Sequence, residues 1–360
     1  MLLHKYTKEE INGVKRIGVI MFGLLGDVIL RTPVIRALKM IYPDATITAL
    51  VDPIGKAVLT HNPDVDKILV FDRTKEKNKL MQNLKKIKSI LRVRNERFDM
   101  IVNLYNGGLS RPMVLFSGAK YRLGFCKKEN KYLYNIKTKC DKDRLRDEQS
   151  LYNFMISIVE PLSDEHFSLK PIFEVPQDVQ QSMQEYLDDF SLPKEKLYLL
   201  NLASSKEDKI LDFEKYFYMV EYLYKQYGYI PLIVSNPSQE YLQERFIQEF
   251  IQSSTIKYIQ LPVLSLDKIA ALIQNTQFLI TPDTGLMHLA MAFDRYIMTI
   301  FTYTHPIFVA PENEKFLSVY EHFDEWKLYQ HQDISCENLQ RNIDSLIEKL
   351  LRNSLNLGRG

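Results

Sequence analysis

The chain reads Leu279-Ile280-Thr281-Pro282-Asp283-Thr284-Gly285-Leu286-Met287-His288-Leu289-Ala290-Met291-Ala292 where an apolar run meets a tight turn and then small helix-forming residues. This order predicts a strand, a glycine-containing turn and the start of a helix. The first backbone N–H groups of such a helix are unpaired and form an anion site with the helix dipole, which suits a phosphate. The Asp283 carboxylate repels that anion, so we expect it to accept hydrogen bonds from sugar hydroxyls. Phosphate and polyol together indicate a nucleotide-sugar.

Outward from this segment, buried strand patterns alternate with amphipathic helix patterns along the whole chain. Strands are predicted at residues 16–22, 46–51, 68–71, 99–104, 197–202, 230–234, 256–260, 278–281 and 296–301. Helices are predicted at residues 28–38, 80–92, 179–190, 213–227, 241–251, 265–274, 286–293 and 336–351. The alternation predicts an α/β fold with parallel, doubly wound sheets covered on both faces.

A proline-punctuated segment at 169–178 interrupts this alternation and indicates a linker. We therefore expect an N-terminal Rossmann-like domain at 1–170, a C-terminal one at 171–335, and a final helical segment at 336–360 that could cross back to the first domain. Ligands of open α/β sheets bind beyond the carboxyl ends of the strands, so two such domains should face each other across a cleft.

Composition places the chain among globular proteins of the cytosol. Its 46% hydrophobic content is ordinary, no apolar run is long enough to span a membrane, and the N-terminus lacks a signal-peptide core. The three cysteines, Cys126, Cys140 and Cys336, lie far apart and support neither a disulfide framework nor a metal site.

Charge is distributed unevenly. Residues 67–148 contain 22 Lys and Arg against 9 Asp and Glu, although the net charge of the chain is only +2. This excess indicates either a solvated helix face with a charged loop, or a patch that attracts an anionic acceptor or the acidic lipids of an inner leaflet. Nucleic acid is less favoured, because the region has no aromatic interleaving and no known binding motif.

The first strand is followed by Gly23-Leu24-Leu25-Gly26-Asp27. Asp27 opens a predicted helix, where its carboxylate could cap the helix or act as a general base toward an attacking hydroxyl. The same turn could instead belong to a dinucleotide-binding dehydrogenase. That class requires GxGxxG and an acidic residue about 20 positions later. The turn has two glycines instead of three, but Asp52 ends the second strand and keeps the alternative open.

A polar loop follows the strand that opens the second half. Ser204 and Ser205 could donate to a diphosphate, and Lys209 could neutralise its charge as the sugar leaves. The loop lacks the P-loop spacing and by itself is an ordinary polar loop. His288 lies one turn into the predicted helix of the opening segment. It is either a core histidine or a hydrogen-bond donor to the phosphate expected there.

These motifs together resemble one known family. Gly26-Asp27 with Thr32-Pro33, then Tyr121-Arg122-Leu123-Gly124-Phe125, Ala203-Ser204-Ser205 with Lys209, and the stretch from Leu261-Pro262 to His288 follow the order typical of that family. It is the ADP-heptose:lipopolysaccharide heptosyltransferase family, glycosyltransferase family 9. Each motif is weak alone, but their order and spacing are specific and span most of the chain.

The resemblance implies a GT-B fold and an inverting sugar transfer without metal or cofactor. It assigns Asp27 as the base and Lys209 as the group that stabilises the leaving diphosphate. The remaining roles concern binding of the donor. The resemblance assigns Asp283 to the sugar, Leu264 to the nucleobase and Glu240 to the ribose. The phosphates are assigned to Ser204, Ser205, Thr284, Gly285 and His288. The implied partners are a nucleotide-sugar and a lipid-linked or oligosaccharide acceptor, met in the cytoplasm or at the inner face of its membrane.

Other functions stay open at this point. The chain has Leu200-Asn201-Leu202 and Tyr303-Thr304-His305-Pro306 where family members often carry His-Pro-Gly and Gly-Pro-Thr-Asp-Pro. Because both departures fall on the donor side, another nucleotide-sugar such as UDP-GlcNAc is an alternative. A nucleotide-sugar-binding protein without turnover and, more remotely, an NAD-dependent oxidoreductase are the others.

Overall fold

The structure is a computed structural model that describes residues 5–105, 107–125, 132–136, 138, 151–310, 313–324 and 327–357. The chain forms two compact units, Met1–Glu174 (unit 1) and Val175–Gly360 (unit 2). Cys126, Cys140 and most of the second basic run, Lys120 to Arg146, lie outside the described residues.

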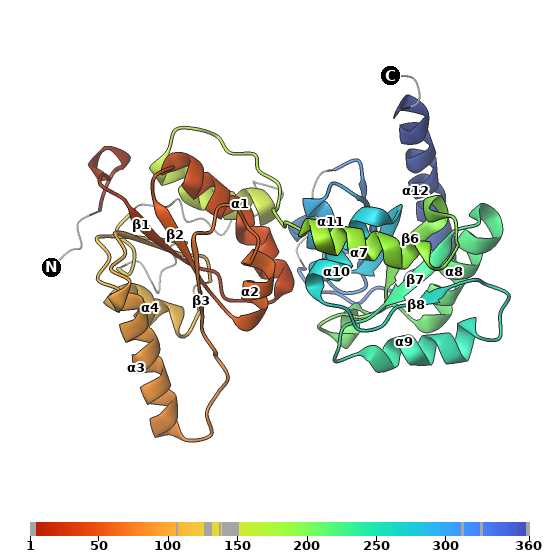
Figure 1. Ribbon diagram of the computed structural model, residues 1–360, viewed down its shortest axis with the longest axis horizontal. Helices are drawn as coiled ribbons and strands as arrows, with labels where there is room; N and C mark the ends of the chain where they lie inside the picture. Colours follow the sequence, from red (N-terminus) through yellow and green to blue (C-terminus); the bar gives the residue numbers. More distant parts are fainter. Residues whose placement is uncertain are drawn as a thin grey trace. The chain divides into compact units, whose positions relative to one another are not determined.

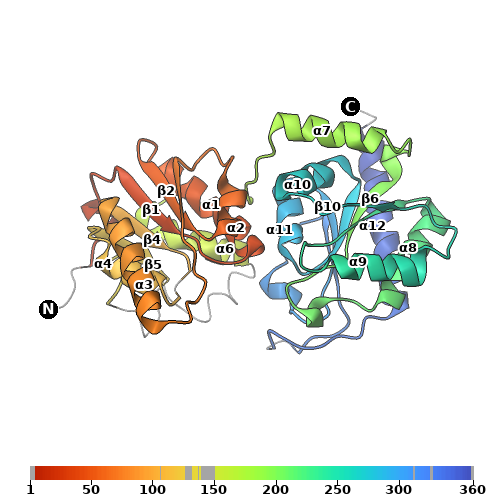
Figure 2. The same ribbon diagram turned by 60° about the horizontal axis from the view of Figure 1, so that its bottom comes forward.

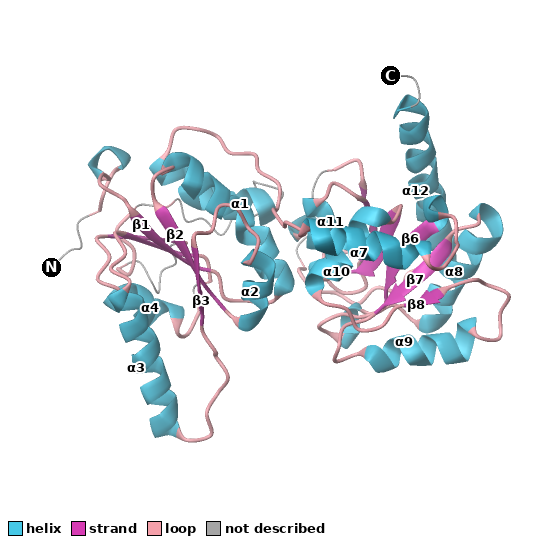
Figure 3. Cartoon of the chain, viewed as in Figure 1, coloured by secondary structure: helices cyan, strands magenta, loops and turns pink. Residues whose placement is uncertain are grey.

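Unit 1 is built on a five-stranded parallel sheet with the order β3-β2-β1-β4-β5. Figures 1 and 3 show the strands β1, β2 and β3 of this sheet. Its strands are β1 (Arg16–Ile20), β2 (Thr46–Val51), β3 (Lys67–Val70), β4 (Met100–Asn103) and β5 (Tyr121–Gly124). The central strand β1 is buried from its second residue onward. Because the strand order reverses direction at β1, the carboxyl ends of β1 and β4 form a switch point where such sheets bind ligands.

Helices cover both faces of this sheet. They are α1 (Leu25–Ile41), α2 (Pro53–Leu59), α3 (Lys79–Asn95), α4 (Ser110–Phe116) and α6 (Leu151–Ile156), the last continued by a 3₁₀ turn at Ser157–Leu162. One face packs against α3 and α4, whose Val93, Met113 and Val114 join the core with Ile20 and Phe22. The helices α2 and α6 both pack against α1.

Helix α1 contains a proline that the fold compensates locally. Pro33 has no N–H to donate to the carbonyl of Ile29, one turn earlier. The hydroxyl of Thr32 donates to that carbonyl instead, at 2.7 Å. The same hydroxyl accepts the N–H of Ile172 at 2.8 Å, so it also ties the end of unit 1 to α1. The Thr32-Pro33 pair thus replaces one lost backbone bond and anchors a distant segment.

We expect Thr32→Val to lower the free energy of unfolding by about 1 to 3 kcal/mol, because it leaves a buried carbonyl and an N–H without partners. Chemical denaturation measures the change. Thr60→Val is the matched control, since the Thr60 hydroxyl donates to the Lys56 carbonyl at 2.7 Å but is exposed. Equal effects in both variants would contradict the anchoring role of Thr32.

Unit 2 contains a six-stranded parallel sheet with the order β11-β10-β9-β6-β7-β8. Its strands are β6 (Leu197–Asn201), β7 (Ile230–Val234), β8 (Ile259–Gln260), β9 (Phe278–Pro282), β10 (Tyr296–Ile300) and β11 (Phe316–Val319). Four of them, β6, β7, β9 and β10, have at most one residue that is not fully buried, as expected for a sheet covered on both faces. The order reverses at β6, so a second switch point lies between β6 and β9.

The helices of unit 2 are α7 (Gln177–Asp188), α8 (Phe213–Tyr227), α9 (Glu240–Phe246), α10 (Leu266–Asn275), α11 (Gly285–Ala292) and α12 (Cys336–Leu357). Helix α9 continues as a π-helical turn at Ile247–Ile251. The helices α8 and α12 pack together on one face of the sheet, and α10 contacts both α7 and α11 (Figure 2).

The long helix α12 belongs to the core of unit 2. Its residues Leu339, Ile343, Leu346 and Ile347 are almost fully buried and pack against α8, β10 and β11. The expectation that the last segment crosses back to the first domain stays a prediction.

The predicted alternation of strands and helices is confirmed in both units, with most boundaries within two residues. The edge strands β5 and β11 and the short helices α2 and α4 were not predicted. Each of the two strands has only four residues, and a polar residue within it, Arg122 in β5 and Ser318 in β11, interrupts the apolar run. The motif Tyr121-Arg122-Leu123-Gly124 therefore forms a strand that its residues alone do not predict.

Candidate functional site

Asp27 lies directly beyond β1, in the first turn of α1. Its Oδ2 accepts the N–H of Leu24, the N-cap residue, at 3.0 Å, so the carboxylate caps the helix from the third helical position. The side chain is nonetheless 47% exposed, which leaves lone pairs open to a ligand. Gly23 has a φ of 150°, and a Cβ there would lie 2.7 Å from Asp27 Oδ2. Only glycine fits this position, so the position of the Asp27 carboxylate depends on the glycine in the turn.

A buried arginine lies next to this carboxylate. Arg31 Nη1 donates to the carbonyl of Phe22 at 2.6 Å, and Nη2 lies 3.8 Å from Asp27 Oδ1. Burial lowers the pKa of the Arg31 guanidinium from its ordinary value, and the negative charge of Asp27 partly opposes that effect. The guanidinium fixes the strand end that precedes the turn and places a positive charge beside the base candidate.

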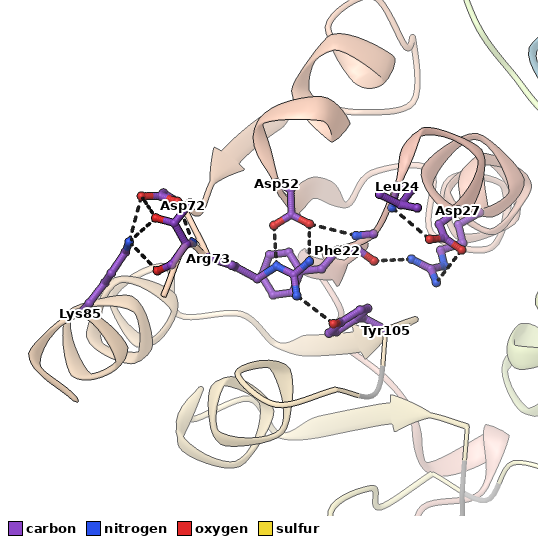
Figure 4. A network of polar contacts seen from close by, with 11 residues as sticks. Phe22, Leu24, Asp27, Asp52, Asp72, Arg73, Lys85 and Tyr105 are labelled. Carbon is purple, nitrogen blue, oxygen red and sulfur yellow. Dashed lines mark hydrogen bonds and ion pairs between the residues drawn. The ribbon is translucent and has the colours of Figure 1, made fainter. Parts of the chain in front are cut away.

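A second arginine, Arg73, hydrogen-bonds residues that follow β2 and β4, next to the same turn (Figure 4). Arg73 donates from Nε and Nη2 to the two oxygens of Asp52, at 2.6 and 2.7 Å, and from Nη1 to the Tyr105 hydroxyl at 2.8 Å. Its guanidinium also lies over the ring of Phe22, 4.9 Å from the centroid. Asp52 in turn accepts the N–H of Gly23 at 3.0 Å. The hydrogen-bonded Asp52 carboxylate raises the pKa of Arg73.

This network decides the role of Asp52. Sequence reasoning kept it as a possible ribose ligand of a dehydrogenase, but both of its oxygens are engaged by Arg73 and one also by Gly23. Sequence reasoning missed Arg73 and Tyr105. Both residues follow strands of the same sheet, β3 and β4, within three residues of the strand end, and that position is the signal that could have found them.

In unit 2 the predicted donor residues lie in the segments that follow β6, β7, β8 and β9, either in the loops or in the helices that begin there. Lys209 follows β6, and Asp283 follows β9, the strand next to it. The two side chains form an ion pair, with Lys209 Nζ 2.5 Å from Asp283 Oδ2, and they are only 16% and 9% exposed. The residue types selected separately from the sequence are thus brought into direct contact beside the N-terminus of α11.

Asn201, at the end of β6, joins the two loops. Its side-chain amide donates to the Thr281 hydroxyl at 2.9 Å and to the Ala203 carbonyl at 3.0 Å, and its Oδ1 accepts the N–H of Ala203. The Thr281 hydroxyl lies 3.1 Å from that of Thr284, the N-cap of α11. Sequence reasoning treated Asn201 only as a departure from the family pattern. Its contacts show that it fixes the loop of Ser204 against the turn of Asp283.

The other predicted residues differ in their surroundings. Ser204 is 2% exposed, and its hydroxyl has no hydrogen-bond partner among the residues that the structure describes. Ser205 is exposed, and His288 is buried one turn into α11. Glu240 is exposed at the start of α9, and Leu264 lies in the loop after β8. Within the described part of the chain, neither of these two hydrogen-bonds to the Asp283 turn.

The segment Thr302–His305 after β10 also contacts the donor loop. The Thr302 hydroxyl donates to the Asp208 carbonyl at 2.8 Å. Lys206 lies over the rings of Tyr303 and Tyr329, with Nζ 5.6 and 5.1 Å from the centroids. Tyr303, from the segment that replaces the usual family motif, stacks on Tyr329, and the two rings support the Ser204–Lys209 loop through Lys206.

No group of three or more His, Cys, Asp or Glu side chains suited to hold a metal ion occurs among the described residues. Within the same residues, none of the helices combines the length and the apolar character that crossing a bilayer requires.

Comparisons with known proteins show the family of this chain. Residues 87–336 match the model of glycosyltransferase family 9 (heptosyltransferase). Lipopolysaccharide heptosyltransferase 1 of Campylobacter coli is 23% identical over 301 residues, which cover 79% of this chain and 83% of that protein. A family 9 glycosyl transferase from Veillonella parvula has a similar structure, with a TM-score of 0.79, 21% identity and coverage of 95% and 99% of the two chains. The E. coli ADP-heptose lps heptosyltransferase II gives a TM-score of 0.73 at 19% identity, with coverage of 94% and 99%. These structures confirm the predicted GT-B fold with two Rossmann-like domains.

Proposed function

This chain belongs to glycosyltransferase family 9, the heptosyltransferase family, and as a glycosyltransferase we propose that it moves a heptose from a nucleotide-sugar to a lipopolysaccharide core acceptor. The curated relatives, which are lipopolysaccharide heptosyltransferases, support this choice of substrates. The observation that carries the proposal is the Lys209–Asp283 pair at the N-terminus of α11, at the switch point of unit 2. We further propose that the enzyme works in the cytoplasm, in peripheral contact with the inner membrane.

We propose that the donor binds at this edge of unit 2. The diphosphate lies against the first N–H groups of α11, where helix ends favour anions. Thr284, Gly285, His288 and the hydroxyls of Ser204 and Ser205 line its phosphates, and Lys209 neutralises their charge. Asp283 then accepts hydrogen bonds from the sugar hydroxyls. Leu264, in the loop after β8, is proposed to meet the nucleobase, and Glu240, the first residue of α9, is proposed to meet the ribose.

The reaction is proposed to be a single displacement with inversion. Asp27 takes the proton of the acceptor hydroxyl, the oxygen attacks the anomeric carbon, and the bond from that carbon to the diphosphate oxygen breaks. The nucleoside diphosphate leaves with the bonding electrons, and Lys209 with the α11 N–H groups stabilises its developing charge. These groups supply the positive charge that a metal ion provides in other transferases, so we propose that none is required.

The experiment is transfer from ADP-heptose to a heptose-deficient lipopolysaccharide core, followed by mass spectrometry of the acceptor. We expect an acceptor one heptose heavier, formed equally well with a chelator present. A panel of other nucleotide-sugars, with UDP-GlcNAc among them, is run in parallel. Transfer from one of these and none from ADP-heptose would overturn the sugar assignment, and binding without transfer from any donor would overturn the proposed catalysis.

Asp52 and Arg73 are proposed to position Asp27 through the N–H of Gly23. Asp52→Asn keeps an acceptor for that N–H but loses the ion pair, whereas Asp52→Ala loses both. Small displacements of a catalytic group can cost on the order of 100-fold in rate, so we expect kcat to fall about 10-fold in the Asn variant and about 100-fold in the Ala variant. The KM for the donor should stay unchanged in both. A similar loss of kcat in the two variants, or a raised donor KM, would contradict the positioning role.

A further inference from the structure

Helix α3 presents a row of apolar side chains to solvent. Leu80, Leu84, Ile87 and Leu91 follow the spacing i, i+4, i+7, i+11, which places them on one helix face. They are 67%, 47%, 52% and 51% exposed. Surface helices ordinarily turn such a face toward the core. On α3 the only buried residue is Val93, which lies more than 100° around the helix from this row.

The neighbouring helix α4 also carries exposed apolar side chains. Leu115 and Phe116, at the end of the neighbouring helix α4, are 53% and 52% exposed. Arg94 Nη1 donates to the carbonyl of Phe116 at 3.3 Å, which joins the end of α4 to the last turn of α3. At the other end, the first turn of α3 and the loop before it lie beyond the strands of the sheet (Figure 1). We call the α3 row with Leu115 and Phe116 the α3 surface.

Cations surround the α3 surface. Residues 72–95 contain nine Lys and Arg against two acidic residues, Asp72 and Glu76. Both acids are engaged by Lys85. Its Nζ lies 2.9 Å from Asp72 (Figure 4) and 3.1 Å from Glu76. The other cations of this stretch include five exposed lysines that form no ion pair with the described residues, namely Lys75, Lys77, Lys79, Lys86 and Lys88.

We propose that the α3 surface docks on an anionic lipid bilayer. A helix with an exposed apolar row and flanking lysines lies in the plane of the interface, with the apolar side chains at the acyl boundary and the ammonium groups among the lipid phosphates. The charge excess selects an anionic leaflet, since the negative surface potential of such a leaflet attracts each lysine near it. An acidic protein surface would satisfy the lysines but leave the leucine row in water. This inference rests on the proposed function, because it takes the acceptor to be lipid-linked. It adds the surface by which the enzyme would dock on the membrane that contains this acceptor.

Co-sedimentation of the full chain with phosphatidylcholine vesicles, with and without about one third phosphatidylglycerol, tests the proposal. We expect binding only to the anionic vesicles, weakened at high salt. Leu84→Gln/Ile87→Gln and Lys86→Glu/Lys88→Glu should each reduce the partition coefficient at least about tenfold. The matched controls are Met40→Gln/Leu351→Gln, on exposed apolar residues of α1 and α12, and Lys257→Glu/Lys268→Glu, with the same charge change in unit 2. The controls should bind like the wild type.

Circular dichroism and transfer to a detergent-free, truncated acceptor are measured for every variant. Both α3 variants should keep their helical signal and their transfer rate, so loss of vesicle binding is separated from misfolding and from failure of the proposed reaction. Vesicle binding that persists in both α3 variants, or no binding of the wild type, would overturn the proposal. A concentration-dependent dimer that the Gln variant abolishes would overturn it as well, because a second copy would then cover the α3 surface.

Discussion

Replacing Asp27 by Asn should lower kcat by about 10²- to 10⁴-fold, the range that a positioned general base contributes. The amide oxygen of Asn can still accept the N–H of Leu24, so the first turn of α1 should keep its geometry. The base is lost, because an amide takes no proton at neutral pH. Donor affinity should not change, since the proposed donor groups all belong to unit 2. Single-turnover rates and donor titration by calorimetry separate the two quantities.

Asp178→Asn is the matched control. Asp178 is an exposed acid in the first turn of α7, so this substitution removes the same charge from the same kind of position. Its kcat should equal that of the wild type. If Asp27→Asn retained more than about a tenth of the wild-type kcat, Asp27 would be a helix cap and not the base.

Replacing Lys209 by Met should weaken donor binding and lower kcat/KM by about 10²- to 10³-fold, the usual cost of removing one preorganised group that stabilises transition-state charge. Met preserves much of the apolar length of the side chain but carries no charge. The same change leaves Asp283 without its partner at 2.5 Å. Part of any loss could therefore come from an unpaired, nearly buried carboxylate and not from the donor.

The double variant Lys209→Met/Asp283→Asn separates these causes. Asn removes the unpaired charge, so a purely structural role of Lys209 predicts recovery of activity in the double variant. The proposed role predicts no recovery of activity, because the double variant lacks the cation that pairs with the phosphates and also changes the carboxylate that accepts hydrogen bonds from the sugar. Lys215→Met is the control, since Lys215 is paired with Asp333 in the same unit but outside the proposed donor site. Wild-type kinetics in Lys209→Met would end the assignment of this residue.

The strands and helices that the sequence predicted correctly are those whose apolar spacing repeats over a full element. The boundaries of α8 (Phe213–Tyr227) and β7 (Ile230–Val234) agree to the residue, because each is a long or uniformly buried element with a glycine between them in the left-handed conformation, Gly228. The short helix α4 and the edge strand β11 gave no such repeat. Their positions depend on packing against residues far away in the chain.

The candidate site divides in the same way. Residue types could be selected from the sequence, because a turn between a strand and a helix defines an anion site and its flanking carboxylate without reference to the rest of the fold. Arg73 was not selected, because its only signal is its place within three residues of the end of β3, and the basic stretch around it obscures that signal. The orientation of α3 was equally inaccessible, because its helical period is the same whether the apolar face points inward or outward.

By itself the sequence determined two doubly wound α/β halves, the family, and the residue types at the ends of β1, β6 and β9, because hydrophobic period and turn chemistry are local properties. Only the tertiary structure decided which of these side chains meet. Asp52 and Arg73 are 21 positions apart, and Lys209 and Asp283 are 74 apart. Their pairing depends on the strand orders β3-β2-β1 and β9-β6. Strand order follows from how the whole core packs, and no short stretch of sequence specifies it.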